Sequence, residues 1–304
     1  RYAHHPLQVL EVESRQGHNR AKILAAPIAI EVVHALSPER ATTTPAAALL
    51  ASTADAAGKL FPPSLERYGL SRRDRITSRS GLPLRDAADR IAEIFTVDEF
   101  DFYVHSAQAP LLTLELTEPA SIVISRSVER MTGSQQAFLL SYAMAALAAR
   151  FHPALRLSAR ELELLLAAST RAVIEGFSTP VAPNARLVER AQLVKKHIPR
   201  RWRRAFEVSA ADYSRTRINV AHWQQSLLHT AIRSALIVCD DLKSGIKVLR
   251  RMHSMPDLRG RELVASSRTV ADLMRFWVSD EAFGARRRCG LIAPPPPPPG
   301  APTP

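Results

Sequence analysis

Apolar residues recur at helical spacing along most of this chain. The pattern predicts helices over residues 22–36, 45–58, 83–95, 133–151, 158–176, 184–198, 216–239 and 241–253, with one or two more between 261 and 290. Thr132 and Ser158 are each followed three residues later by Gln or Glu, which is the capping-box pattern of a helix start. Gly58 stands where the second of these helices is expected to end.

The period switches to two between residues 100 and 125. Phe100 to His105 and Leu112 to Thr117 alternate between apolar and polar side chains, and Ser121 to Ser125 follows a turn at Glu118-Pro119-Ala120. We expect three strands in one small antiparallel sheet, with His105 on the solvent side. The predicted fold class is therefore mainly α with a small antiparallel β-sheet (α+β).

A turn-rich stretch containing Pro62-Pro63 and Gly69 indicates a boundary near residue 60. We expect an N-terminal helical segment at 1–59, a larger domain at 60–292 and a polyproline tail at 293–304. The tail cannot pack as helix or sheet and should be extended, either as a spacer or as a ligand for an aromatic groove. The chain begins with Arg1 instead of Met, which suggests a fragment of a longer protein.

Composition narrows the class of protein. With 46% hydrophobic and 23% charged residues, the chain suits a helical globule, and no run of eighteen apolar residues predicts a membrane span. The cysteines, Cys239 and Cys289, lie far apart and form no Cys-x-x-Cys motif, which favours a reducing cytoplasmic compartment.

Motifs for cofactors and metals are not found in the sequence. It contains no P-loop, no Gly-x-Gly-x-x-Gly and no Gly-x-Ser-x-Gly, so we expect no cofactor. His222 and His229 share a helical face, but seven residues separate them by about 10 Å, too far to chelate one ion.

The strand pair that leads into a capped apolar helix, with a second long helix much later, resembles the gluzincin metallopeptidases related to the CaaX prenyl protease. In that family the first helix carries His-Glu-x-x-His, and the later helix supplies a Glu ligand with an Asp four residues beyond it. The resemblance places Tyr142, Ala143 and Ala146 at the first motif. It places Leu228 at the ligand Glu and Ile232 at the accompanying Asp.

The loss of these groups does not depend on the alignment register. No His, Asp or Glu occurs between Met131 and Arg150, and no Asp or Glu occurs between Tyr213 and Cys239. A zinc site needs imidazole nitrogens and carboxylate oxygens, so the resemblance implies a peptidase-like domain that is not a metalloprotease and not an enzyme.

Three further segments resemble bacterial proteins in which such a degenerate domain follows tetratricopeptide-type helical repeats. They are Tyr68 to Asp74, Trp223 to Leu242 and Phe276 to Leu291, and the resemblance covers about residues 60 to 292. It implies that residues 20 to 57 would end a helical-repeat arm and that the chain is part of a larger assembly.

Part of the net charge of +12 comes from one dense cluster of basic residues. The candidate binding patch comprises Lys195, Lys196, Arg200, Arg201, Trp202, Arg203 and Arg204. It could contact phosphates and stack on a base, or it could be a solvated helix junction whose arginine stems cover Trp202. We expect a non-catalytic scaffold or interaction module with a protein partner; the alternative is a nucleic-acid-associated or other acidic-partner-binding protein.

Overall fold

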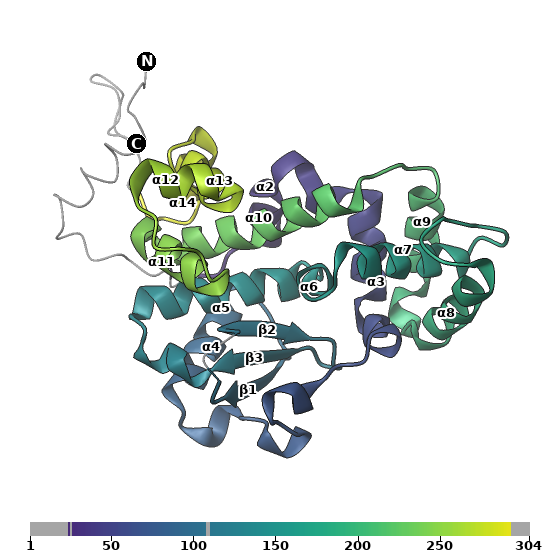
Figure 1. The fold of residues 1–304 in the computed structure, drawn as a ribbon, viewed down its shortest axis with the longest axis horizontal. Coiled ribbons are helices and arrows are strands. Elements are labelled where there is room, and N and C mark those ends of the chain that lie inside the picture. Colours follow the sequence, from purple (N-terminus) through teal and green to yellow (C-terminus); the bar gives the residue numbers. More distant parts are fainter. Residues whose placement is uncertain (1–23, 25, 108–109, 293–304) are drawn as a thin grey trace, which may run out of the picture.

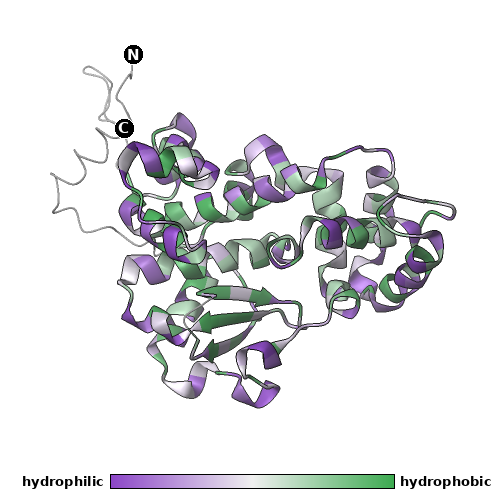
Figure 2. Ribbon diagram, viewed as in Figure 1, coloured by the Kyte–Doolittle hydropathy of each residue, from purple (hydrophilic) through white to green (hydrophobic). Residues whose placement is uncertain are grey.

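The computed structural model describes residues 24, 26–107 and 110–292 (Figure 1). Its centre is a pair of long helices, α5 (Gly133–Ala148) and α10 (Val220–Cys239), which make the most extensive contact between two elements in this part of the chain. Every residue of α5 from Ala137 to Ala146 is buried. Hydrophobic residues run along both helices in Figure 2. A helix that is apolar all round is a core element, so α5 is enclosed on all sides.

The other helices gather mainly at the two ends of this pair (Figure 1). At one end lie α3 (Pro45–Leu60), α7 (Ala159–Arg171), α8 (Asn184–His197) and α9 (Arg203–Tyr213). At the other lie α11 (Leu242–Met252), α12 (Gly260–Ser266), α13 (Arg268–Trp277) and α14 (Asp280–Arg288). The remaining helices are α2 (Ile30–Ala35), α4 (Pro83–Ile94) and α6 (His152–Arg156). The mainly helical fold class is confirmed, although α6 and α9 were not predicted.

Both predicted capping boxes are present. Thr132 Oγ1 accepts from the Gln135 amide at 3.4 Å, and Gln135 Oε1 accepts from the Thr132 amide at 3.2 Å. Ser158 and Glu161 exchange the same two bonds at 3.3 and 2.8 Å. These reciprocal bonds fix the first residues of α5 and α7.

The small sheet is mixed instead of wholly antiparallel. Its strands are β1 (Asp101–His105), β2 (Leu112–Glu115) and β3 (Ser121–Ser125), in the order β1-β3-β2. The β2–β3 pair is antiparallel as predicted, but β1 pairs with β3 in parallel. All five residues of β3 are buried, which suits a central strand, and its insertion between the other two sets the parallel pairing.

His105 does not face solvent as the alternation predicted. It is 2% exposed, and its ring lies 5.4 Å from the ring of Tyr68. The loop after Tyr68 also reaches the sheet, where the Ile76 amide donates to Phe102 O at 2.8 Å. A segment from outside the sheet therefore covers its second face, and strand alternation carries no information about such a cover.

The first predicted helix is much shorter than residues 22–36. Its described part begins only at Ile30, after Pro27, a residue that disfavours a helical conformation before it. The amides before it bond elsewhere: Leu24 donates to Val238 O at 2.9 Å and Ile28 to Ile94 O at 2.7 Å. This segment therefore straps α4 to α10 in place of extending α2, and residues 22 and 23 lie outside the described part.

Gly58 does not end its helix, because α3 continues to Leu60. A Cβ atom at Gly58 would lie 1.9 Å from Leu116 O. The glycine is thus required where α3 approaches the backbone that follows β2.

The helices on both sides of the predicted boundary near residue 60 contribute to one hydrophobic core. The predicted polyproline tail at 293–304 lies outside the described residues. Among those residues, no helix combines the length and apolar character that crossing a bilayer requires.

Candidate functional site

The positions that the resemblance assigns to the peptidase motif lie on the two central helices. Tyr142 is 7% exposed, Ala143, Ala146 and Ile232 are fully buried, and Leu228 is half-buried. Burial raises the pKa of the Tyr142 phenol far above its usual value, so the hydroxyl stays protonated. In the part of the chain that the structure describes, no three His, Cys, Asp or Glu side chains come together in a way that could hold a metal ion.

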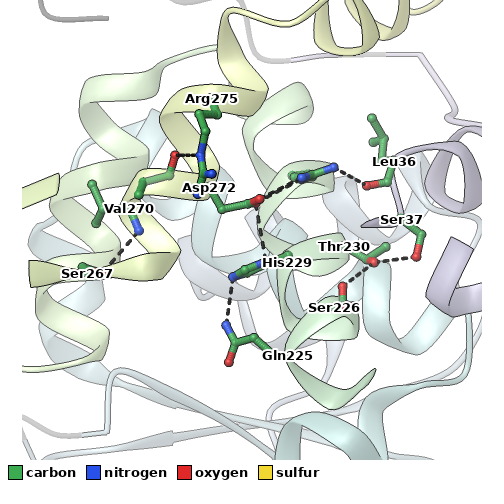
Figure 3. Close-up of polar contacts among 12 residues, drawn as sticks. Leu36, Ser37, Gln225, Ser226, His229, Thr230, Ser267, Val270, Asp272 and Arg275 are labelled. Carbon is green, nitrogen blue, oxygen red and sulfur yellow. Dashed lines mark hydrogen bonds and ion pairs between the residues drawn. The ribbon is translucent and has the colours of Figure 1, made fainter. Parts of the chain in front are cut away.

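A polar cluster joins α10 to α13 (Figure 3). Arg233 on α10 binds Asp272 on α13 with two bonds, Nη2 to Oδ1 at 2.8 Å and Nε to Oδ2 at 3.1 Å. The same arginine lies 3.5 Å from Glu281 Oε2 and donates weakly to Leu36 O. The cluster thus connects α13, α14 and the end of α2 to the central helix.

His229 approaches the same carboxylate, with Nδ1 3.6 Å from Oδ2. Its Nε2 is 2.8 Å from Gln225 Nε2. An amide nitrogen only donates, so His229 Nε2 accepts and Nδ1 carries the proton toward Asp272. Burial lowers the pKa of His229, against the opposing effect of Asp272, so the ring is neutral at pH 7.

This arrangement packs helices together and leaves no free base. Gln225 occupies the His229 nitrogen that a general base would need. His222 lies seven residues earlier on α10. Its Nε2 is 2.9 Å from Oε2 of Glu39, and both side chains are exposed. The two histidines therefore have separate partners, in line with the distance that their spacing predicts.

Hydroxyl groups extend the same contact toward the N-terminal helices. Thr230 Oγ1 lies 3.0 Å from Ser37 Oγ and 2.9 Å from Ser226 O (Figure 3). Each of these three residues is buried, so the bonds satisfy polar groups that would otherwise destabilise the core.

The basic segment forms the corner between α8 and α9. Lys195 and Lys196 end α8, the 3₁₀ turn Arg200–Trp202 follows, and Arg203 and Arg204 begin α9. All six cations are exposed. Among them, Arg201 alone pairs with a carboxylate in the described chain, Asp55 at 3.6 Å.

Trp202 is half-buried and an arginine covers it, but that arginine lies outside the segment. The guanidinium of Arg150 lies 4.5 Å from the ring centroid. Arg150 is itself fixed by Ala51 O at 2.8 Å and Asp55 Oδ1 at 2.9 Å. The arginine whose guanidinium covers the ring therefore comes from outside the segment. Arg150 belongs to the end of α5, and nothing near Trp202 in the sequence indicates it.

Two ionisable side chains in this region were missed by sequence reasoning. His152 is 6% exposed, and burial, followed by the charge of Arg150, lowers its pKa to about 3. Glu115, on β2, is fully buried and pairs with Arg156 of α6 at 3.2 Å. The Glu115–Arg156 pair joins β2 to α6, whereas His152 Nδ1 is buried without a hydrogen-bond partner in the described chain.

Both cysteines are free thiols, and they differ in burial. Cys239 is fully buried and Cys289 is half-buried. Burial raises the pKa of the Cys239 thiol far above its usual value, which keeps it protonated and unreactive.

Comparison of the chain with protein-family models, with curated proteins and with solved structures finds no match.

Proposed function

We propose that this protein is a non-catalytic scaffold or protein-interaction module, built on a peptidase-like frame without a zinc site. The observation that carries the proposal is the apolar packing of α5 on α10. Alanine, leucine and isoleucine stand at the positions that bear ligands in the resembling family, and they offer no electron pair to a metal ion.

The packing also gives those positions a structural role. Ala143, Ala146 and Ile232 have no exposed surface, and each belongs to the hydrophobic core to which both helices contribute. The Tyr142 phenol, held protonated by burial, neither binds a cation nor activates water at neutral pH. A frame stabilised in this way keeps its surface available for binding.

The cellular compartment, the assembly and the partner of the protein are part of the same proposal. Free cysteines suit a reducing cytoplasmic compartment, and the resemblance favours membership of a larger assembly that contains helical repeats. We propose another protein as the partner.

Binding to nucleic acid is the second candidate, and the exposed cations between Lys195 and Arg204 favour it. Stacking of Trp202 on a base is less favoured, because Arg150 covers one side of the ring. Retention on immobilised DNA over a salt gradient separates the two: we expect elution at low salt, without the steep salt dependence of a protein that neutralises many phosphates.

Peptidase activity is tested directly with a peptide mixture. The purified chain is equilibrated with Zn²⁺, incubated with the mixture, and assayed for new peptide termini by mass spectrometry. We expect no cleavage beyond that of a heat-inactivated sample. Cleavage that a chelator stops and that Tyr142→Phe reduces would contradict the proposal, since this variant keeps the ring and removes only the hydroxyl.

A further inference from the structure

The corner between α8 and α9 presents five cations without an internal partner: Lys195, Lys196, Arg200, Arg203 and Arg204. Each is exposed, and in the described chain none lies within 4 Å of a carboxylate. Glu207, one turn further along α9, is exposed but forms no ion pair with Arg203. These five residues define the α8–α9 basic surface.

No ion pair within the described chain holds the arginines of this surface. They stand in the 3₁₀ turn and the first turn of α9, at the positive end of the helix dipole. No acidic residue occupies either first turn, and neither Pro199 nor Trp202 caps the backbone with a side chain. Positive charges at a positive helix end repel both the helix end and one another, so a polyanion outside the chain would relieve this repulsion.

The surface is held on a rigid support. Trp202, in the middle of the arginines, is half-buried beneath Arg150, which follows the C-terminal end of α5 and pairs with Asp55 of α3 at 2.9 Å. Arg201 contacts the same carboxylate group. Because the support joins three helices, the cations around it start from a fixed backbone, which reduces the entropy lost on binding.

An apolar side chain adjoins the surface and indicates the class of partner. Val208, one helical turn after Arg204, is 57% exposed. Only Val278 and Phe283 share such exposure among the large apolar side chains of the described residues. A phosphate backbone would leave Val208 in water, whereas a peptide with carboxylates and an apolar side chain would engage both Arg204 and Val208.

We propose that the α8–α9 basic surface docks an acidic, amphipathic segment of a partner protein. Its carboxylates pair with the five cations, and an apolar side chain covers Val208. The inference rests on the proposed function, that of a non-catalytic interaction module.

The test measures fluorescence anisotropy of labelled probes with the full chain. One probe is a synthetic peptide that repeats Glu-Glu-Leu, the second has Gln in place of Glu, and the third is an oligothymidylate. We expect the acidic peptide to bind, the Gln peptide to bind at least about tenfold more weakly, and salt to weaken the acidic complex.

Two charge-matched triple variants locate the binding. R200S/R203S/R204S should weaken the acidic peptide at least about tenfold. R72S/R73S/R79S, which removes three exposed arginines elsewhere, should weaken it less than about twofold. Equal loss in both variants would show attraction by net charge alone and would overturn the proposal. R200S/R203S/R204S should melt no lower than the natural chain, because it removes repulsion among the arginines. If it does melt lower, the single variants Arg200→Ser and Arg204→Ser take its place in the binding comparison.

Val208→Ser distinguishes the class of partner. We expect it to weaken the acidic peptide several-fold while leaving the weak binding of oligothymidylate unchanged. Tighter binding of oligothymidylate than of the peptide, with no effect of Val208→Ser, would assign the surface to nucleic acid. Zinc-dependent peptide cleavage would overturn the proposed function and leave these binding results unaffected, so the two failures are distinguishable.

Discussion

Arg233 on α10 and Asp272 on α13 form a two-pronged ion pair, with nitrogen–oxygen distances of 2.8 and 3.1 Å. The guanidinium also lies over the ring of Phe276, 4.9 Å from its centroid. Both charged side chains are mostly shielded, with exposures of 12% and 17%. With the Asp240–Arg286 pair at the end of α10, it connects the central helix to the group formed by α13 and α14.

Breaking the pair should loosen that connection. Asp272→Asn leaves the shielded Arg233 with only the more exposed Glu281 as a counter-charge, and we expect the free energy of unfolding to fall by about 2 kcal/mol. Urea unfolding followed by circular dichroism measures the change. The control, Asp257→Asn, removes an acid that is 75% exposed and should have little effect. If Asp272→Asn and Asp257→Asn lowered the free energy of unfolding equally, the claim that burial makes the Asp272 pair important would be contradicted.

Gly58→Ala tests the close approach of α3 to the chain after β2. Its new methyl group would meet Leu116 O at 1.9 Å, and a backbone atom cannot move aside cheaply. We expect a loss of about 3 kcal/mol in thermal or urea unfolding.

The matched control for that change is Gly284→Ala in α14. The nearest atom there is the end of Arg288, at 3.5 Å, so the methyl group fits. Alanine favours a helix over glycine, and stability should rise by up to about 1 kcal/mol. A Gly58→Ala variant as stable as Gly284→Ala would show that the two segments do not approach as described.

The buried histidine on α6 makes stability depend on pH. Burial lowers the pKa of His152 to about 3, so between pH 6.5 and 3 the unfolded chain binds a proton that the folded chain does not. Above pH 6.5 the titration of His152 does not change the free energy of unfolding. As the pH drops from 6.5 toward 3, this titration lowers the free energy of unfolding by up to about 1.4 kcal/mol per pH unit.

Urea unfolding from pH 7 to pH 4 checks this dependence. His152→Asn should make the pH dependence shallower, because it removes the ring whose pKa burial lowers in the folded chain. An unchanged slope in His152→Asn would mean that the ring takes up its proton equally readily in the folded and the unfolded chain, so that burial does not lower its pKa.

Local patterns in the sequence predicted most of the helices, because periodicity and capping residues such as Thr132 and Ser158 act within one or two turns. They did not predict the order of the strands, since alternation says nothing about which strand lies beside which. The burial of His105 depends on Tyr68, which arrives from outside the sheet. Such tertiary contacts leave no local signal.

The same distinction holds for the candidate sites. The basic segment is contiguous, so its sequence alone identified the exposed cations from Lys195 to Arg204. The covering of Trp202 by Arg150 was missed, as was the Arg233–Asp272 pair, whose residues lie 39 positions apart. Charge composition identifies a local cluster, whereas long-range pairs become visible only when the helices are packed.

The most direct test of the central claim is elemental analysis of the purified chain after equilibration with Zn²⁺ and removal of the unbound metal. If Tyr142, Ala143, Ala146, Leu228 and Ile232 serve only as packing residues of the hydrophobic core, zinc should remain far below one atom per chain, and a chelator should leave the melting temperature unchanged. One tightly held zinc per chain, located beside Tyr142 and Leu228 by a crystal structure, would contradict it.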